Sequence, residues 1–158
     1  MNNEIKIIWK NILIGGTAAG IVSIIPIINI LNLFLMLWMG CGGALAVYLT
    51  MRENNYRKPK TSEALLTGAL SGVWGCTILG VFVYIALTRI SPEKFAKAAS
   101  LLQAFFPNIR EEFAHLFQDN NLQSLFLMIF ALLMVLSIIS GAAGGIISKS
   151  MSYKEEDE

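Results

Sequence analysis

Charged residues are scarce in this sequence, and the few that it has are clustered. They make up 15% of the 158 residues, against roughly 25% in an average soluble domain. None lies between Lys10 and Arg52, between Glu63 and Arg89, or between Asp119 and Lys149. Together with 55% hydrophobic residues and a mean hydropathy of +0.61, this pattern excludes an ordinary soluble domain and indicates a membrane protein.

Residues that commonly carry chemistry are also scarce. The single histidine, His115, has no second histidine or cysteine nearby, so no zinc ligand set is present. Cys41 and Cys76 fall at similar depths in uncharged stretches, where a thiolate is disfavoured, and we expect inert packing residues rather than a functional pair. No Gly-Lys-Ser or Gly-Lys-Thr follows any glycine, which excludes a phosphate-binding loop.

The charges that are present exclude further classes. The net charge is +1, and no basic cluster is larger than Arg57 to Lys60, so nucleic acid is not an expected partner. Membrane enzymes and proton-coupled transporters usually place an ionisable residue inside the bilayer, and the uncharged stretches contain no acidic, basic or histidine residue. We therefore expect no enzyme activity, no cofactor and no metal.

The uncharged stretches predict an all-α, polytopic membrane protein. A transmembrane helix needs about 20 residues, so the second and third stretches hold one helix each and the first, about twice as long, holds two. Pro26, Asn29 and Asn32 are the turn-type residues within that first stretch and predict a tight turn. Four spans follow, arranged as two hairpins in a single membrane domain over 1–158, at about residues 7–25, 31–51, 63–88 and 122–148.

Three polar segments complete the predicted topology. Residues 52–62 form a loop in which Ser62 is the expected cap of the third helix. Residues 149–158 form an acidic tail, and we expect its end, Lys154 to Glu158, to be disordered. Residues 91–121 begin with Ser-Pro-Glu and interleave charges with phenylalanines at helical spacing, which predicts an amphipathic helical segment. This segment either lies in the membrane interface or caps the bundle.

The distribution of lysine and arginine predicts the orientation in the cell membrane. With four spans, both termini share a side with the loop 52–62, and together they carry more basic residues than the segment 91–121. The positive-inside rule therefore places both termini in the cytoplasm and the segment 91–121 outside. The alternative for the N-terminus is a cleavable signal peptide ending near Thr17 to Ala19, but the apolar run continues past that site.

Glycine occurs inside the predicted spans, although it is the poorest ordinary helix former except proline, by about 1 kcal/mol relative to alanine. Lipid does not drive apolar helices together as water does, so close van der Waals contact between small faces takes that role. Small residues four apart occur in every span. The candidate helix-packing residues are Gly16, Gly20, Gly40, Gly43, Ala44, Gly68, Gly72, Gly141 and Gly145. Spacing alone leaves open whether the facing helix belongs to the same chain or to a second copy.

Two weaker patterns accompany the glycines. The third span carries a polar stripe of Ser71, Trp74, Cys76 and Thr77, for which we expect hydrogen bonds between helices and, as the alternative, a hydrated pathway; its possible counterparts are Thr17, Ser23, Asn29 and Asn32. The segment 13–20 also aligns with 65–72, which is compatible with a duplicated hairpin or with shared selection for small residues.

The segments GGTAAGIVSIIPIIN and GCGGALAVYL, followed by a short basic loop, resemble uncharacterised small multi-pass membrane proteins of prokaryotes with a glycine-rich first hairpin. The resemblance covers roughly residues 13–75. It implies the membrane fold and brings no activity and no functional residues with it.

The leading hypothesis for function is therefore interaction. The protein is expected to associate with itself, as a homo-oligomer, or with another membrane protein through its small-residue faces, with the lipid bilayer around it. The runner-up is a small channel or transporter formed by an oligomer. A third class is an enzyme working at the external segment through Glu111, Glu112 and His115, and substitution of all three would test it.

Overall fold

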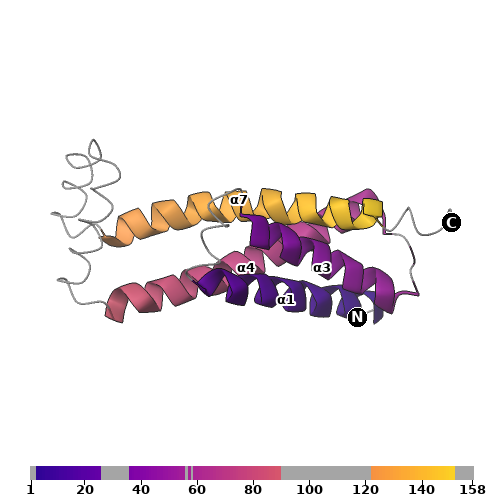
Figure 1. The fold of residues 1–158 in the computed structure, drawn as a ribbon, viewed down its shortest axis with the longest axis horizontal. Helices are drawn as coiled ribbons and strands as arrows, with labels where there is room; N and C mark the ends of the chain where they lie inside the picture. The colour runs from indigo at the N-terminus through magenta and orange to yellow at the C-terminus, as the bar shows by residue number, and fades with distance from the viewer. Residues whose placement is uncertain (1–2, 26–35, 56, 58, 90–121, 152–158) are drawn as a thin grey trace. The chain divides into compact units, whose positions relative to one another are not determined.

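The structure is a computed structural model that describes residues 3–25, 36–55, 57, 59–89 and 122–151. These residues form four helices and no strand: α1 (Asn3–Ile24), α3 (Leu37–Glu53), α4 (Thr61–Arg89) and α7 (Leu122–Met151) (Figure 1). The all-α class predicted from the sequence is confirmed. The predicted external segment 91–121 lies outside the described residues, as do residues 152–158 of the predicted tail.

Three of these helices are long and apolar enough to cross a membrane. They are α1, the Thr61–Ala86 part of α4 and the Phe126–Met151 part of α7. Helix α3 has 17 residues and is about 26 Å long at 1.5 Å per residue, against about 30 Å of hydrocarbon. The structure thus shows three candidate spans where the sequence predicts four, and the two-hairpin arrangement stays a prediction.

The helix ends follow from local backbone chemistry. Helix α1 ends at Ile24, two residues before Pro26, because proline disfavours the helical conformation at the residue that precedes it. Helix α3 begins at Leu37 rather than near residue 31, because Met36 is left-handed with φ 52°, and a left-handed residue cannot continue a right-handed helix.

The expected cap of α4 is wrong. Ser62 lies inside the helix, which begins at Thr61. The capping group is instead the Glu63 carboxylate, which accepts a hydrogen bond of 3.0 Å from the backbone N–H of Lys60. This is the reciprocal half of a capping box, in which the third helical residue reaches back to the residue before the helix.

The chain divides into two compact units, one of residues 1–81 and 133–158 and one of residues 82–132. The single membrane domain predicted from the sequence stays a prediction. In the smaller unit, the ring centroids of Tyr84 and Phe126 lie 5.8 Å apart, and those of Phe126 and Phe130 lie 5.9 Å apart. The side chains from Phe82 to Ile85 are all exposed.

In the larger unit, α1 and α4 run in one direction and α3 and α7 in the other (Figure 1). Helix α1 packs against α3 and α4, and α7 packs against the same two helices. A hydrogen bond of 2.8 Å from Lys149 to Thr61 and an ion pair of 2.7 Å between Lys10 and Glu53 join the helices at one end. We call this the charged end of the bundle.

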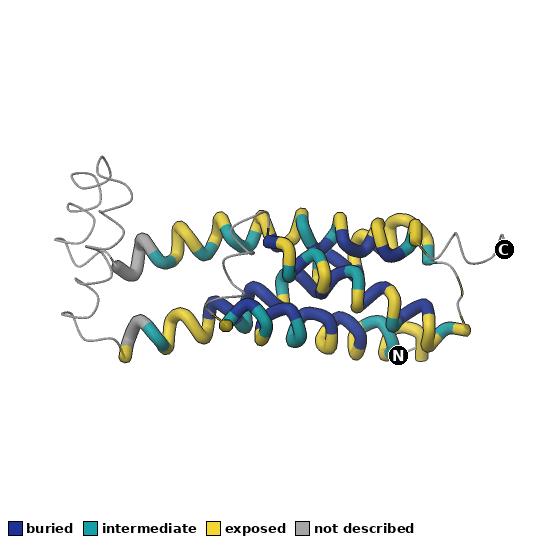
Figure 2. Tube along the Cα trace, viewed as in Figure 1, coloured by how far each residue is buried: buried dark blue, intermediate teal, exposed yellow. Residues whose placement is uncertain are grey.

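In this unit the buried residues lie on the sides of the helices that face one another, and the exposed residues lie on the outer sides (Figure 2). The interior combines polar and small residues with a few larger apolar ones such as Met39 and Val47. The buried polar residues are Asn11, Ser23, Thr50, Thr67, Ser71, Ser137 and Ser148. Large aliphatic side chains such as Ile21, Leu66 and Ile139 are more than half exposed. Soluble domains bury most of their large apolar side chains, so this distribution is that of a bundle whose surroundings are apolar.

Candidate functional site

The predicted helix-packing glycines of α1 face α4. A β-carbon placed on Gly20 would lie 3.0 Å from the carbonyl oxygen of Gly75, and one placed on Gly16 would lie 2.6 Å from the carbonyl oxygen of Ser71. Real β-carbons essentially never come closer than 3.0 Å. Glycine at position 16 therefore allows the two parallel helices to approach at backbone distance.

The predicted glycines of α4 and α7 face each other. A β-carbon on Gly68 would collide with the carbonyl oxygen of Gly141, and one on Gly72 with that of Ser137. A β-carbon on Gly145 would collide with the carbonyl oxygen of Ala64. Side chains at these positions would force the helices apart.

Helix α3 uses its small residues against α7. A β-carbon on Gly43 would collide with the carbonyl oxygen of Gly141, and one on Gly40 would lie 3.0 Å from the Ser140 hydroxyl oxygen. Ala44 is half-buried. Helix α7 thus presents Gly141 to both α3 and α4, which makes it the central position of the contact.

Four further glycines make these contacts and are absent from the predicted set of helix-packing residues: Gly15, Gly42, Gly75 and Gly144. Gly15 and Gly42 meet between α1 and α3, and Gly144 meets the backbone of Gly40. Gly15 and Ala19 are four apart, as are Gly42 and Ala46, so the same spacing rule applied to every small residue of a span would have found the α1–α3 contact. Since all of these contacts are made within one chain, the small faces build the bundle itself.

The aligned segments 13–20 and 65–72 do not make equivalent contacts. Gly16 aligns with Gly68, but Gly16 faces α4, which runs parallel to its own helix, whereas Gly68 faces the antiparallel helix α7. The contacts therefore give no support to a duplicated hairpin beyond the alignment itself.

Two side chains of the predicted polar stripe, Trp74 and Cys76, hydrogen-bond to other helices. The indole Nε1 of Trp74 donates a hydrogen bond of 3.0 Å to the Thr17 hydroxyl oxygen. The hydroxyls of Ser23 and Thr77 instead donate to the carbonyl oxygens of Ala19 and Val73 in their own helices, at 2.8 Å each. Asn29 and Asn32 lie outside the described residues.

The two cysteines have different surroundings. Cys76 is buried in α4 and its side chain hydrogen-bonds Ser137 of α7. Cys41 is exposed on α3, and both cysteines are free thiols. The described residues thus contain no disulfide between them.

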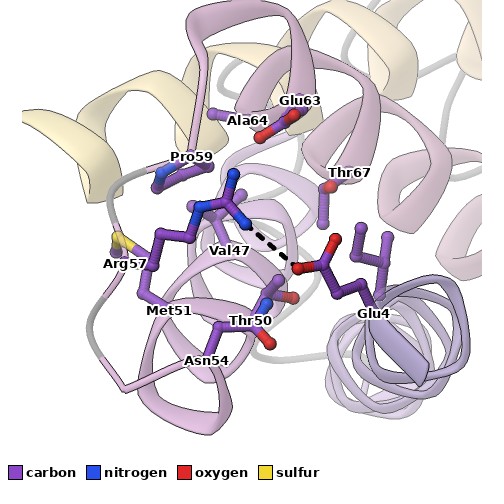
Figure 3. Close-up of a pocket in the computed structure, with 11 residues that line it drawn as sticks. Glu4, Val47, Thr50, Met51, Asn54, Arg57, Pro59, Glu63, Ala64 and Thr67 are labelled. Carbon is purple, nitrogen blue, oxygen red and sulfur yellow. Dashed lines mark hydrogen bonds and ion pairs between the residues drawn. The ribbon is translucent and has the colours of Figure 1, made fainter. Parts of the chain in front are cut away.

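A cleft of about 70 Å³ opens at the charged end, between α1, α3 and α4 (Figure 3). Its lining residues are Glu4, Ile8, Val47, Thr50, Met51, Asn54, Arg57, Pro59, Glu63, Ala64 and Thr67. The Arg57 guanidinium reaches toward α1 and pairs with the Glu4 carboxylate at 3.0 Å. Both side chains of this pair are mostly exposed, so the pair adds at most about 1 kcal/mol to stability.

Two buried polar side-chain atoms have no hydrogen-bond partner among the described residues. Asn11 donates from Nδ2 to the hydroxyl oxygen of Thr50 at 3.4 Å, but its Oδ1 accepts nothing. The Thr50 hydroxyl itself donates to the carbonyl oxygen of Ala46 at 2.8 Å. The hydroxyl of Ser71, fully buried on α4, also lacks a partner.

No group of three or more His, Cys, Asp or Glu side chains in the described part of the chain is arranged to hold a metal ion. The candidate enzyme residues Glu111, Glu112 and His115 lie outside that part. The polar interior, the small faces and the cleft are thus the features from which a function has to be argued.

The fold and these features define the class of a helical membrane protein with three helices that are long and apolar enough to cross a bilayer. No protein family model, curated protein or solved structure matches the chain.

Proposed function

We propose that this chain is a non-enzymatic integral membrane protein that crosses the cell membrane four times and acts by assembly, with a second copy or with another membrane protein. The observation that carries the proposal is the outward surface of large apolar side chains, such as Ile21, Leu66 and Ile139. The small faces, through which the sequence predicts association, close on one another within the chain and are not free for a partner. The bundle is then a preformed unit, and the outward apolar side chains are left to contact lipid and a partner.

We assign the fourth crossing to α3. Helix α3 runs alongside α7 in the same direction, and its Glu53 end lies at the charged end with the beginning of α1. The basic residues there include Lys10, Arg52, Arg57, Lys60 and Lys149. By the positive-inside rule this end is cytoplasmic.

Photo-crosslinking from outward positions tests the assembly. A benzoylphenylalanine at Leu66 or Ile139, each more than 60% exposed, replaces one large apolar side chain by another and should leave the bundle intact. We expect protein adducts from the positions on one face of the bundle and lipid adducts from the rest. Two differently tagged copies expressed together separate self-association from a foreign partner. Lipid adducts alone from every outward position would contradict the proposal.

A small channel or transporter formed by an oligomer is the second candidate, and the polar interior favours it. Thr50, Thr67, Ser71 and Ser137 are all buried between the helices. Flux of small neutral solutes into vesicles that contain the purified protein separates this candidate from pure assembly, because an assembly protein leaves the permeability of the vesicle unchanged.

A further inference from the structure

We infer that the cleft between α1, α3 and α4 is a blind, water-filled vestibule, which carries solvent from the charged end of the bundle to Thr50 and Thr67. The inference concerns one protomer and does not rest on the assembly proposed above. Its ligand is water itself, held inside an otherwise close-packed membrane bundle.

The size of the cleft selects the ligand. Its volume of about 70 Å³ exceeds the roughly 30 Å³ that one water molecule occupies in the liquid, and it is well below the roughly 300 Å³ at which pockets for drug-sized ligands begin. The cleft therefore has room for a few water molecules and is small for a drug-sized ligand.

The lining supplies the partners that ordered water needs. A buried water typically makes about three hydrogen bonds, and each of the three helices contributes an oxygen-bearing side chain to the lining: Glu4 from α1, Thr50 from α3, and Thr67 from α4. The Glu63 carboxylate of α4 also faces the cleft (Figure 3). Polar atoms on every side distinguish this cleft from the dry apolar gaps that proteins leave empty.

A buried polar residue, Asn11, contacts the lining of the cleft from the interior of the bundle. Asn11 is fully buried and donates from Nδ2 to the hydroxyl oxygen of Thr50, which lines the cleft, while its Oδ1 has no partner. An unsatisfied buried acceptor is costly, at about 1–3 kcal/mol. Water that moves past Thr50 would satisfy it, which gives the vestibule a physical reason to lie at this point.

Beyond the cleft, away from the charged end, the helices of the bundle pack closely. Gly16 approaches the backbone of Ser71 too closely for a β-carbon, and Met39 is 0% exposed where α1, α3 and α4 meet around Gly75. Close packing of this kind leaves no room for water. The vestibule therefore ends before Met39 and is not a continuous pore in this conformation.

Hydroxyl-radical footprinting of the full chain in lipid nanodiscs tests this inference, because the radicals form from water next to the labelled side chain. Met51 and Met39 are a matched pair on α3: both are almost fully buried, at 3% and 0% exposure, but only Met51 lines the cleft. We expect Met51 to be oxidised several-fold faster than Met39.

Filling the cleft should remove that difference. Thr67→Phe fills it from α4 and Val47→Phe from α3, so a folding defect of one variant does not decide the outcome, and either should slow oxidation of Met51 several-fold. Leu66→Phe, next to Thr67 but outward-facing, is the control and should change nothing. Equal slow oxidation of both methionines in the natural chain, or Met51 oxidation unaffected by both fillings, would overturn the vestibule. Fast oxidation of Met39 as well would overturn its blind end.

Discussion

Replacing Gly141 by leucine is expected to prevent the bundle from forming. A β-carbon at this position would collide with the carbonyl oxygen of Gly68 and would lie 3.2 Å from Gly72 Cα. These are backbone atoms of α4, which cannot move aside as a flexible side chain can. Gly141 also contacts Gly43 of α3, so a larger side chain here would separate α7 from two helices at once.

For the smaller change Gly141→Ala, two opposing effects decide whether the free energy of unfolding rises or falls. Helix propensity alone favours alanine over glycine by about 1 kcal/mol, whereas overpacking a close contact costs about 1–3 kcal/mol. We expect a net loss of stability for alanine and no stable fold for leucine, measured by denaturant titration of the protein in detergent micelles with tryptophan fluorescence as the readout.

Ala143 provides the matched control for this prediction. It lies two residues further along α7 and is exposed, so Ala143→Leu enlarges the same helix where it meets no neighbour. Its stability should stay within about 0.5 kcal/mol of the natural protein. Equal effects of leucine at positions 141 and 143 would show that α7 does not pack through Gly141.

Replacing Met39 by alanine is expected to cause the second-largest loss of stability. Met39 is 0% exposed and forms the centre of a cluster with Ala19, Met36 and Leu79. Its sulfur also lies 2.8 Å from the position of a β-carbon on Gly75, so it occupies the space that this glycine leaves. Alanine would leave a void there, bounded on one side by a glycine that cannot fill it.

The expected cost is at least about 2 kcal/mol, the lower end of the range for truncating a buried methionine. The lower end applies because the unfolded helices are still surrounded by lipid, so the loss is one of van der Waals contact rather than of hydrophobic transfer. Met128→Ala is the same chemical change at a side chain that is 66% exposed and should be nearly neutral. A neutral Met39→Ala, measured in the same titration, would contradict the packing described for α1, α3 and α4.

The ends of the apolar helices were largely predictable, because charged residues mark where lipid ends. The described limits of α4 and α7 lie within three residues of the predicted ones. Helix α1 begins at Asn3 rather than near residue 7, since hydropathy marks the edge of the bilayer and a helix can continue beyond it. The beginning of α3 falls inside an uncharged stretch and depends on the left-handed Met36, which no composition signal indicates.

The sequence predicts which side of each helix is small, but not which helix packs against that side. Spacing identifies which side of a helix permits close approach, and it contains no information about the partner. Gly16 and Gly20 therefore pack against α4 rather than against the next helix along the chain. The cleft depends on three helix ends and a connecting segment meeting at one place, and neither Asn11 nor Thr67 carries a sequence signal that singles it out.

The central claim is that α3 crosses the membrane, so that the chain makes four crossings through a bundle joined by small faces. Topology reporters fused at the N-terminus, inserted after Asn55 between α3 and α4, and fused after Glu158 test it directly. The account predicts that all three report the cytoplasm. If the Asn55 reporter lies on the opposite side of the membrane from the N-terminus, α3 does not cross and the account is contradicted.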